Sequence, residues 1–217
     1  MLQCDFQRVL NRCLTGFRMI RGAGFMDIVG LCLELGVDNA VEASVDELVL
    51  QPEVRGLCEV NTCGRFGRNF TCPPYVGEID ALIEKVKSFD RVVIWQNIYE
   101  LEDSFDFEGM MEGQTKHQSM TLDVARRVYT ELGTESSLVL TAGGCFRCAK
   151  CASESGETCR NPDKALASLE SYGVNLGETC KNIGMNYING KDTVTYFSGA
   201  FLLKKGRWLS VLKGSRV

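Results

Sequence analysis

The cysteines of this chain are concentrated in two short stretches, and this clustering constrains the fold more than any other feature of the sequence. The denser stretch, residues 143–151, carries Cys145, Cys148 and Cys151, and Cys159 follows it closely. Cysteines at two-residue intervals in one loop can reach different sides of one small inorganic group. We therefore expect the chain to fold around a metal centre in this loop.

The spacing of these cysteines favours an iron–sulfur cluster over a zinc ion. A four-iron cluster needs one thiolate per iron, and the bacterial ferredoxin run supplies three cysteines at these intervals with a fourth followed by proline. Here the last spacer has seven residues, and Pro162 follows Cys159 by three positions. A structural zinc site with four cysteines is the alternative. Zinc ligands usually come as two separated pairs, whereas here three cysteines crowd into seven residues.

A second group of cysteines lies upstream, in a long loop that contains several glycines. Its members are Cys58, Cys63 and Cys72, and loops of this length in compact domains are usually functional or disordered. The two loops together supply seven candidate ligands, one short of two complete four-cysteine clusters. Three arrangements fit that count: one full cluster with a second that has an open iron, ligands interleaved between the loops, or one cluster bound by both. His117 and Cys180 are the candidates for an eighth ligand.

Six cationic residues flank these cysteines. Positive charge near a thiolate-bound cluster offsets its negative charge and raises its reduction potential. For any single one of these residues, a solvent-exposed position at the rim of the loops is an equally good explanation. The remaining three cysteines fall in helical stretches and are interpreted as ordinary thiols. The cations are Arg55, Arg65, Arg68, Arg147, Lys150 and Arg160, and the ordinary thiols are Cys4, Cys13 and Cys32.

Composition narrows the class of protein. The 217 residues carry a net charge of −4 and have a pI near 5.2, so the chain lacks the basic character of a nucleic-acid binder. Eleven cysteines without a secretory signal indicate a reducing compartment, and we expect a cytoplasmic protein. No apolar run approaches the roughly 20 residues that a membrane span needs.

Hydrophobic spacing predicts an alternation of strands and helices. This order indicates an α/β or α+β fold, with a single-layer mixed sheet, packed helices and two long cysteine-bearing loops at one end. Residues 1–25 are either an N-terminal appendage or an ordinary first helix, and residues 26–217 form a single metal-binding domain. The predicted helices are 26–36, 77–89, 115–132, 162–172 and 177–183, the strands are 47–50, 91–101, 137–141, 194–203 and 208–212, and residues 102–113 are a surface loop or flap.

Four motifs carry a resemblance to a known family. They are Val54-Arg55-x-x-Cys58-x-x-Asn61-x-Cys63-Gly64-x-Phe66-Gly67, Cys72-Pro73-Pro74-x-Val76-Gly77, Gly143-Gly144-Cys145-x-x-Cys148-x-x-Cys151 and Cys159-Arg160-x-Pro162. Over residues 26–203 the chain resembles the predicted metal-binding proteins called domain of unknown function 2284. Members come mainly from anaerobic bacteria and archaea, which implies oxygen-sensitive clusters. The chain departs from the family at Phe66, where tyrosine is usual, and residues 1–25 lie outside the resemblance, which favours an appendage.

The sequence therefore predicts an iron–sulfur protein that binds one or two [4Fe–4S] clusters and passes electrons to or from a redox partner protein. Two alternatives remain open, an enzyme whose three-cysteine cluster binds substrate at an open iron, and a non-redox zinc module that organises a partner surface. Nucleic acid and membrane are not expected as partners. The predicted ligands are Cys58, Cys63, Cys72, Cys145, Cys148, Cys151 and Cys159.

Overall fold

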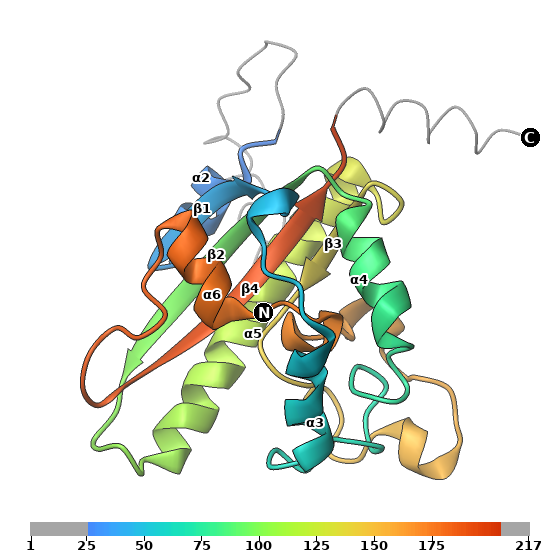
Figure 1. The fold of residues 1–217 in the computed structure, drawn as a ribbon. Helices are drawn as coiled ribbons and strands as arrows, with labels where there is room; N and C mark the ends of the chain where they lie inside the picture. Colours follow the sequence, from blue (N-terminus) through green and yellow to red (C-terminus); the bar gives the residue numbers. More distant parts are fainter. Residues whose placement is uncertain (1–25, 205–217) are drawn as a thin grey trace, which may run out of the picture.

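A four-stranded antiparallel sheet forms the centre of the computed structural model, which describes residues 26–204 (Figure 1). The strand order is β1-β2-β4-β3, and all three neighbouring pairs are antiparallel. The predicted combination of helices and strands is confirmed, with an antiparallel rather than a mixed sheet. The strands are β1 (Asn39–Ser44), β2 (Arg91–Glu100), β3 (Ser137–Leu140) and β4 (Thr193–Leu202).

Helices cover both faces of the sheet. In Figure 1, α4 and α6 lie in front of the strands and α5 lies behind them. None of the helices within residues 26–204 is long and apolar enough to cross a membrane. The α-helices are α2 (Ile28–Glu34), α3 (Gly56–Val60), α4 (Ile79–Lys87), α5 (Phe107–Leu132) and α6 (Leu176–Ile183), and short 3-10 turns are η1 (Val45–Glu47), η2 (Pro52–Arg55), η3 (Ala152–Ser155), η4 (Pro162–Lys164) and η5 (Glu170–Tyr172).

The central strand β2 divides the core into two halves. Val92 and Ile94 pack on the face covered by α4 and α6, whereas Val93 and Trp95 pack on the face covered by α2 and α5. All four side chains are fully buried. This alternation follows from the two-residue period of a strand, and burial on both faces explains the continuous apolar run from Val92 to Trp95.

The predicted strand over residues 47–50 is wrong, because the first strand is β1 and the chain turns directly after it. Ser44 and Glu47 form a capping box, in which Glu47 Oε2 accepts from the Ser44 amide at 2.8 Å and Ser44 Oγ accepts from the Asp46 amide at 3.3 Å. A capping box starts a helical turn, which here is η1. The β-branched and apolar residues that follow are therefore not part of a strand.

Helix α5 begins within the range predicted as a surface loop, so that prediction is also wrong. Asp106 caps the helix by accepting from the Gly109 amide at 2.8 Å. Gly113 allows the helix to lie against β2, because a Cβ there would stand 2.9 Å from the ring of Tyr99. Gly109 and Gly113, two glycines of this segment, thus serve the capping and the close packing of the helix.

The predicted helix over residues 162–172 consists only of the short turns η4 and η5. Between them the chain is extended and pairs with Thr141, whose amide donates to the Ala167 carbonyl at 2.8 Å and whose carbonyl accepts from the Leu169 amide at 3.2 Å. This pairing with the end of β3 outweighs the helical preference of the segment. The predicted segments 1–25 and 208–212 lie outside the described residues. The other predicted helices and strands are confirmed within a few residues.

Candidate metal centre

The two cysteine loops lie against each other at one end of the fold. The Asn69 side chain donates from Nδ2 to the Cys145 carbonyl at 2.7 Å, and the Cys145 amide donates to Thr71 Oγ1 at 3.0 Å. Thr71 Oγ1 in turn donates to Asn69 Oδ1 at 3.0 Å, and both side chains are buried. These two residues of the upstream loop therefore fix the backbone at the first cysteine of the downstream loop.

Helix α5 holds the entry to the downstream loop from the other side. Its buried residue Gln118 donates from Nε2 to the carbonyls of Ala142 at 2.8 Å and Gly144 at 2.9 Å. A Cβ on Gly144 would stand 2.8 Å from the sulfur of Cys72, so a larger residue there would displace a thiol of the upstream loop. Sequence patterns did not identify Asn69, Thr71 or Gln118 as part of the site.

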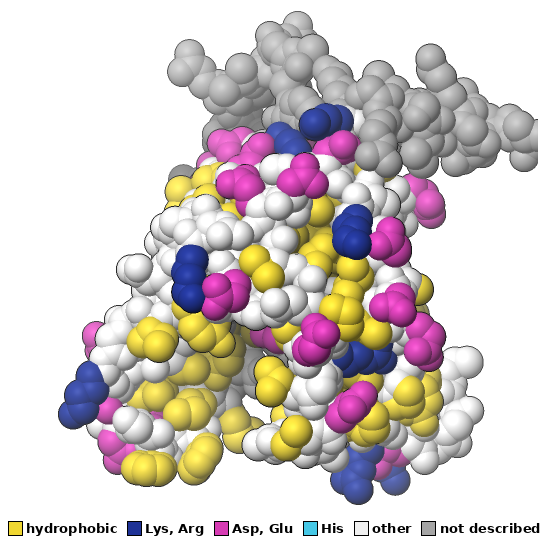
Figure 2. Space-filling view, viewed as in Figure 1, with side chains coloured by type: hydrophobic (Ala, Val, Ile, Leu, Met, Phe, Trp, Pro, Cys, Tyr) yellow, Lys and Arg dark blue, Asp and Glu magenta, His cyan; other side chains and the backbone are white. Residues whose placement is uncertain are grey.

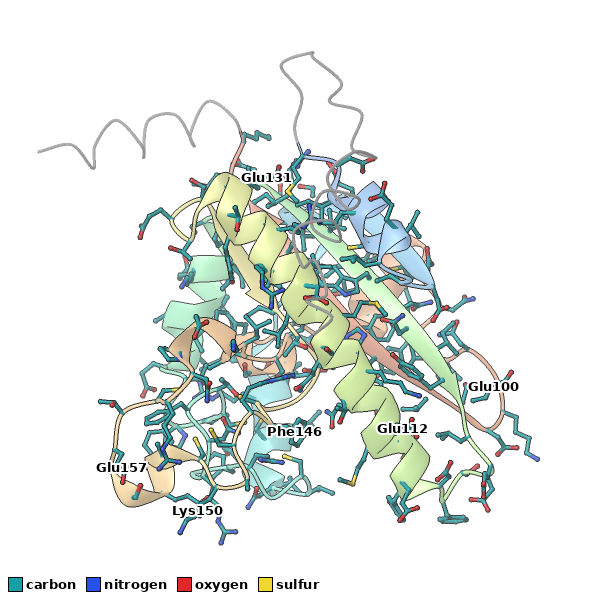
Figure 3. The ribbon with its side chains drawn as sticks, turned by 180° about the vertical axis from the view of Figure 1, so that it is seen from behind. Glu100, Glu112, Glu131, Phe146, Lys150 and Glu157 are labelled. Carbon is teal, nitrogen blue, oxygen red and sulfur yellow. The ribbon has the colours of Figure 1, made fainter. Side chains whose placement is uncertain are left out.

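All four cysteines of the downstream loop line one small recess. Figure 3 shows sulfur atoms gathered near the labelled residues Phe146, Lys150 and Glu157. Residues 69–71 of the upstream loop complete the wall of the recess. A set of four thiols with no carboxylate among them suits a soft metal or an iron–sulfur cluster. The four cysteines are Cys145, Cys148, Cys151 and Cys159.

The thiols around this recess affect one another. Burial raises the pKa of Cys145, the amide and guanidinium of Arg147 oppose this effect, and the sulfurs of Cys159 and Cys148 raise the pKa further. Burial would also raise the pKa of Cys151, but the neighbouring polar groups of Ser153 and the Phe70 backbone outweigh it and lower that pKa. A bound cation attracts the thiolates and therefore favours their charged forms. This attraction outweighs the repulsion between the thiolates.

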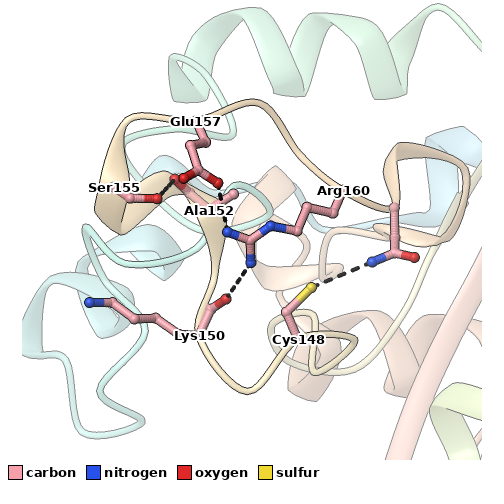
Figure 4. Close-up of polar contacts among 7 residues, drawn as sticks. Cys148, Lys150, Ala152, Ser155, Glu157 and Arg160 are labelled. Atoms are coloured by element: carbon pink, nitrogen blue, oxygen red, sulfur yellow. Dashed lines mark hydrogen bonds and ion pairs between the residues drawn. The ribbon is translucent and has the colours of Figure 1, made fainter.

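A polar network surrounds the sulfur of Cys148 (Figure 4). Asn161 donates from Nδ2 to Cys148 Sγ at 3.4 Å. Arg160 forms an ion pair with Glu157 at 2.7 Å and donates to the Lys150 carbonyl at 3.4 Å. These contacts connect the end of the loop with its start, and hydrogen bonds to a ligand sulfur are one means of tuning a metal site.

The three upstream cysteines form a second group. Burial raises the pKa of Cys72 to about 11, and the nearby sulfurs of Cys63 and Cys58 raise it as well. Burial likewise raises the pKa of Cys58, and Cys63 contributes there too. The three thiols thus lie within electrostatic reach of each other, and the seven predicted ligands divide into four and three.

The thiols are not gathered about a single point. Among residues 26–204, no three His, Cys, Asp or Glu side chains are placed to hold one metal ion. Zinc bound by four sulfurs at about 2.3 Å would bring those sulfurs within about 4 Å of each other. The cysteines instead line the sides of a recess.

Both candidates for an eighth metal ligand are packed in other parts of the fold. The ring nitrogens of His117 lie 2.8 Å from Asn97 Oδ1 and 2.7 Å from Ser198 Oγ, in a fully buried network between α5 and the sheet. Cys180 belongs to the apolar core on the opposite face, and burial raises its pKa to about 11. Both side chains therefore have structural surroundings apart from the two groups of thiols.

The flanking cations differ in their surroundings. Arg65 lies over the ring of Phe146, with 4.1 Å between its guanidinium carbon and the ring centroid, and so adds a contact between the two loops. Arg68, Arg147 and Lys150 are exposed. Arg55 is different, because it is only 9% exposed although it carries a full charge.

Comparison with protein families identifies the chain. A family model described as "Predicted metal-binding protein (DUF2284)" matches residues 42–202. The chain belongs to this family. The DUF2284 match runs from within β1 to the last residue of β4, so it includes both cysteine loops and the rest of the sheet. It confirms the resemblance seen in the motifs, although it begins later than residue 26. We found no match among curated proteins or among solved structures.

Proposed function

We propose that this protein is an iron–sulfur protein that holds one or two [4Fe–4S] clusters and exchanges electrons with a partner protein. The observation that carries the proposal is that four cysteines line one recess. Four thiolates are the complete protein ligand set of one [4Fe–4S] cluster, and such a cluster supplies one-electron transfer when bound. Cys145, Cys148, Cys151 and Cys159 would hold it, and Asn161 would donate a hydrogen bond to a ligand sulfur.

The spacing of the downstream cysteines along the sequence supports a cluster over a zinc ion, because three of them lie within seven residues. A four-iron cluster spaces its thiolates more widely than a single tetrahedral ion, because each sulfur binds a different iron. The four downstream cysteines line one recess, as the ligands of a single cluster would. Zinc remains the alternative, as a non-redox module that organises a partner surface.

The surface around the site supports a protein partner. Large apolar side chains are exposed on or beside the cysteine loops, and Figure 2 shows apolar side chains gathered on the lobe that carries α3. Exposed apolar patches commonly mark interaction sites. Nine free cysteines among the described residues suit a reducing compartment, and we propose the cytoplasm. The exposed side chains are Leu57, Val60, Tyr75 and Phe146.

A second candidate function rests on the upstream group. Cys58, Cys63 and Cys72 interact electrostatically with each other, and the recess of the downstream cysteines does not include them. In a four-iron cluster held by three cysteines, one iron has no cysteine ligand. An enzyme could bind substrate at that iron, so this group favours catalysis more than the downstream group does.

Reversible reduction tests the leading proposal. We expect the anaerobically reconstituted protein to be brown, to lose visible absorbance on stepwise addition of dithionite, and to recover it on reoxidation. Electron paramagnetic resonance of the reduced sample should show a cluster signal that disappears on reoxidation. Absorbance that does not respond to the reductant, in protein that contains iron and sulfide, would contradict a role in electron transfer.

A further inference from the structure

The side chain of Asn161 does not have the role that its place in the sequence suggests. An asparagine directly before a proline is typical of a helix start, where its side chain accepts from a backbone amide. Asn161 does precede the turn η4, but within the described part of the chain its side chain forms no capping hydrogen bond. The amide group is therefore available for another partner.

That partner is the sulfur of Cys148. Asn161 Nδ2 lies 3.4 Å from Cys148 Sγ, and Figure 4 draws this contact as a dashed line that ends at Cys148. A thiolate can only accept, so the nitrogen of the amide is the atom that faces it. Both side chains are half-buried in the wall of the same recess, where a hydrogen bond is stronger than in water.

Contacts of the preceding residue hold Asn161 in this position. The Arg160 guanidinium forms an ion pair with Glu157 at 2.7 Å and donates from Nη1 to the Lys150 carbonyl at 3.4 Å. On the other side, Pro162 restricts the backbone because its ring fixes φ. Asn161 thus lies between an arginine that is bound to the cysteine loop and a rigid proline.

A second donor reaches a ligand sulfur of the same recess, but it comes from the backbone. The Arg147 amide donates to Cys145 Sγ at 3.5 Å. A backbone amide is present with almost any side chain at that position, whereas the donor at position 161 exists only because the residue is asparagine. A substitution of Asn161 therefore removes one donor and leaves all four cysteines in place.

We propose that Asn161 raises the reduction potential of the cluster held by the downstream cysteines, by donating a hydrogen bond to the Cys148 thiolate. The inference rests on the proposed iron–sulfur function and adds to it a residue that adjusts the potential. One electron from the partner reduces the cluster, and no covalent bond forms or breaks. The reduced cluster carries one more negative charge, so the donor stabilises it more than the oxidised cluster.

A redox titration followed by electron paramagnetic resonance tests this assignment in anaerobically reconstituted protein. Asn161→Leu keeps a side chain of similar size without a donor, and its midpoint potential should shift to a more negative value. Asn161→Asp replaces the donor with a carboxylate, and its potential should shift further in the same direction. The matched control is Asn186→Asp, which adds the same charge at an exposed position outside the recess, and its potential should equal that of the unsubstituted protein.

The outcomes separate this proposal from the proposed function. The signal that shifts should be missing from Cys145→Ala, because it belongs to the downstream cluster. Equal potentials in the Asn161 variants and the unsubstituted protein, or a shift to a more positive value, would overturn the role of Asn161 and leave the iron–sulfur function standing. Folded Asn161 variants without iron, beside a loaded control, would also overturn it, because Asn161 would then be needed for assembly.

Two further results complete the test. If Asn161→Leu fails to fold, the potential of Asn161→Asp, whose side chain has nearly the same shape as asparagine, decides by itself. The absence of iron and sulfide from every protein, including Asn186→Asp, would overturn the proposed function.

Discussion

With both sites filled, replacing Cys145 with alanine is expected to remove about half of the iron and acid-labile sulfide from the reconstituted protein, and with the downstream site alone filled it should remove nearly all of both. Cys145 is one of the four thiols around the downstream recess, and Asn69 and Thr71 fix its backbone there. Loss of one of four thiolates opens one iron to water and destabilises the cluster. The upstream site keeps its own ligands, so it should retain its metal. Iron and sulfide per chain, measured beside the unsubstituted protein, check the prediction.

Cys180→Ala is the matched control for this substitution. It also removes a single thiol, but Cys180 lies in the apolar core with Leu176 and Ile183. Metal content should be unchanged, and the free energy of unfolding should fall slightly, as for other small losses of buried volume. Equal iron in the Cys145 and Cys180 variants would show that the downstream thiols do not hold the cluster.

Acidification is expected to destabilise the fold through His117. Burial lowers the pKa of His117 to about 4 from its ordinary 6.5, because the charged imidazole would lose its hydration. The unfolded chain takes up a proton below pH 6.5, whereas the folded protein does not until near pH 4. The neutral ring of His117 therefore makes its full contribution to the free energy of unfolding above pH 6.5, and this contribution is lost as the pH falls. From pH 8 to pH 5 the free energy of unfolding decreases by about 2 kcal/mol for this reason.

The hydrogen bonds of His117 support a neutral ring. Asn97 Oδ1 can only accept, so Nδ1 carries the proton and Nε2 accepts from the Ser198 hydroxyl. Asn97 Nδ2 donates to the Gly36 carbonyl at 3.2 Å, which supports this orientation of the amide. Ser198 is fully buried, so this serine and histidine pair stabilises the fold and has no access to substrate.

Two measurements check the His117 prediction. Because the chain contains one histidine, nuclear magnetic resonance of selectively labelled protein reports this ring alone, and no titration should be seen between pH 8 and pH 5. His117→Gln keeps a side chain that can form hydrogen bonds but does not titrate, so its unfolding free energy should depend less on pH. A ring that titrates near pH 6.5, or equal pH dependence in the two proteins, would contradict the account.

Structural features could be predicted from the sequence where a chemical motif or a hydrophobic period repeats among neighbouring residues. The spacing of Cys145, Cys148 and Cys151 indicated a metal centre before any fold was known, and the β-branched and aromatic residues of segment 91–101 predicted the strand β2. Helix α4 followed from apolar residues at intervals of three and four. Such signals depend on neighbours along the chain, so they can be recognised without tertiary structure.

Contacts between distant residues could not be predicted. Asn69 and Thr71 bind the Cys145 backbone across 76 and 74 residues, and no local pattern distinguishes them from ordinary loop residues. The sequence contains one indication of a role for Gln118, because it is a polar residue next to the apolar face of a predicted helix.

The most direct test of the central claim is a count of iron, acid-labile sulfide and zinc in protein purified and reconstituted without oxygen. If both sites fill, the account predicts about eight iron atoms and about eight sulfides per chain, with little zinc. About four of each would indicate that the downstream site alone is filled. Zinc near stoichiometry, with neither iron nor sulfide, would contradict the account.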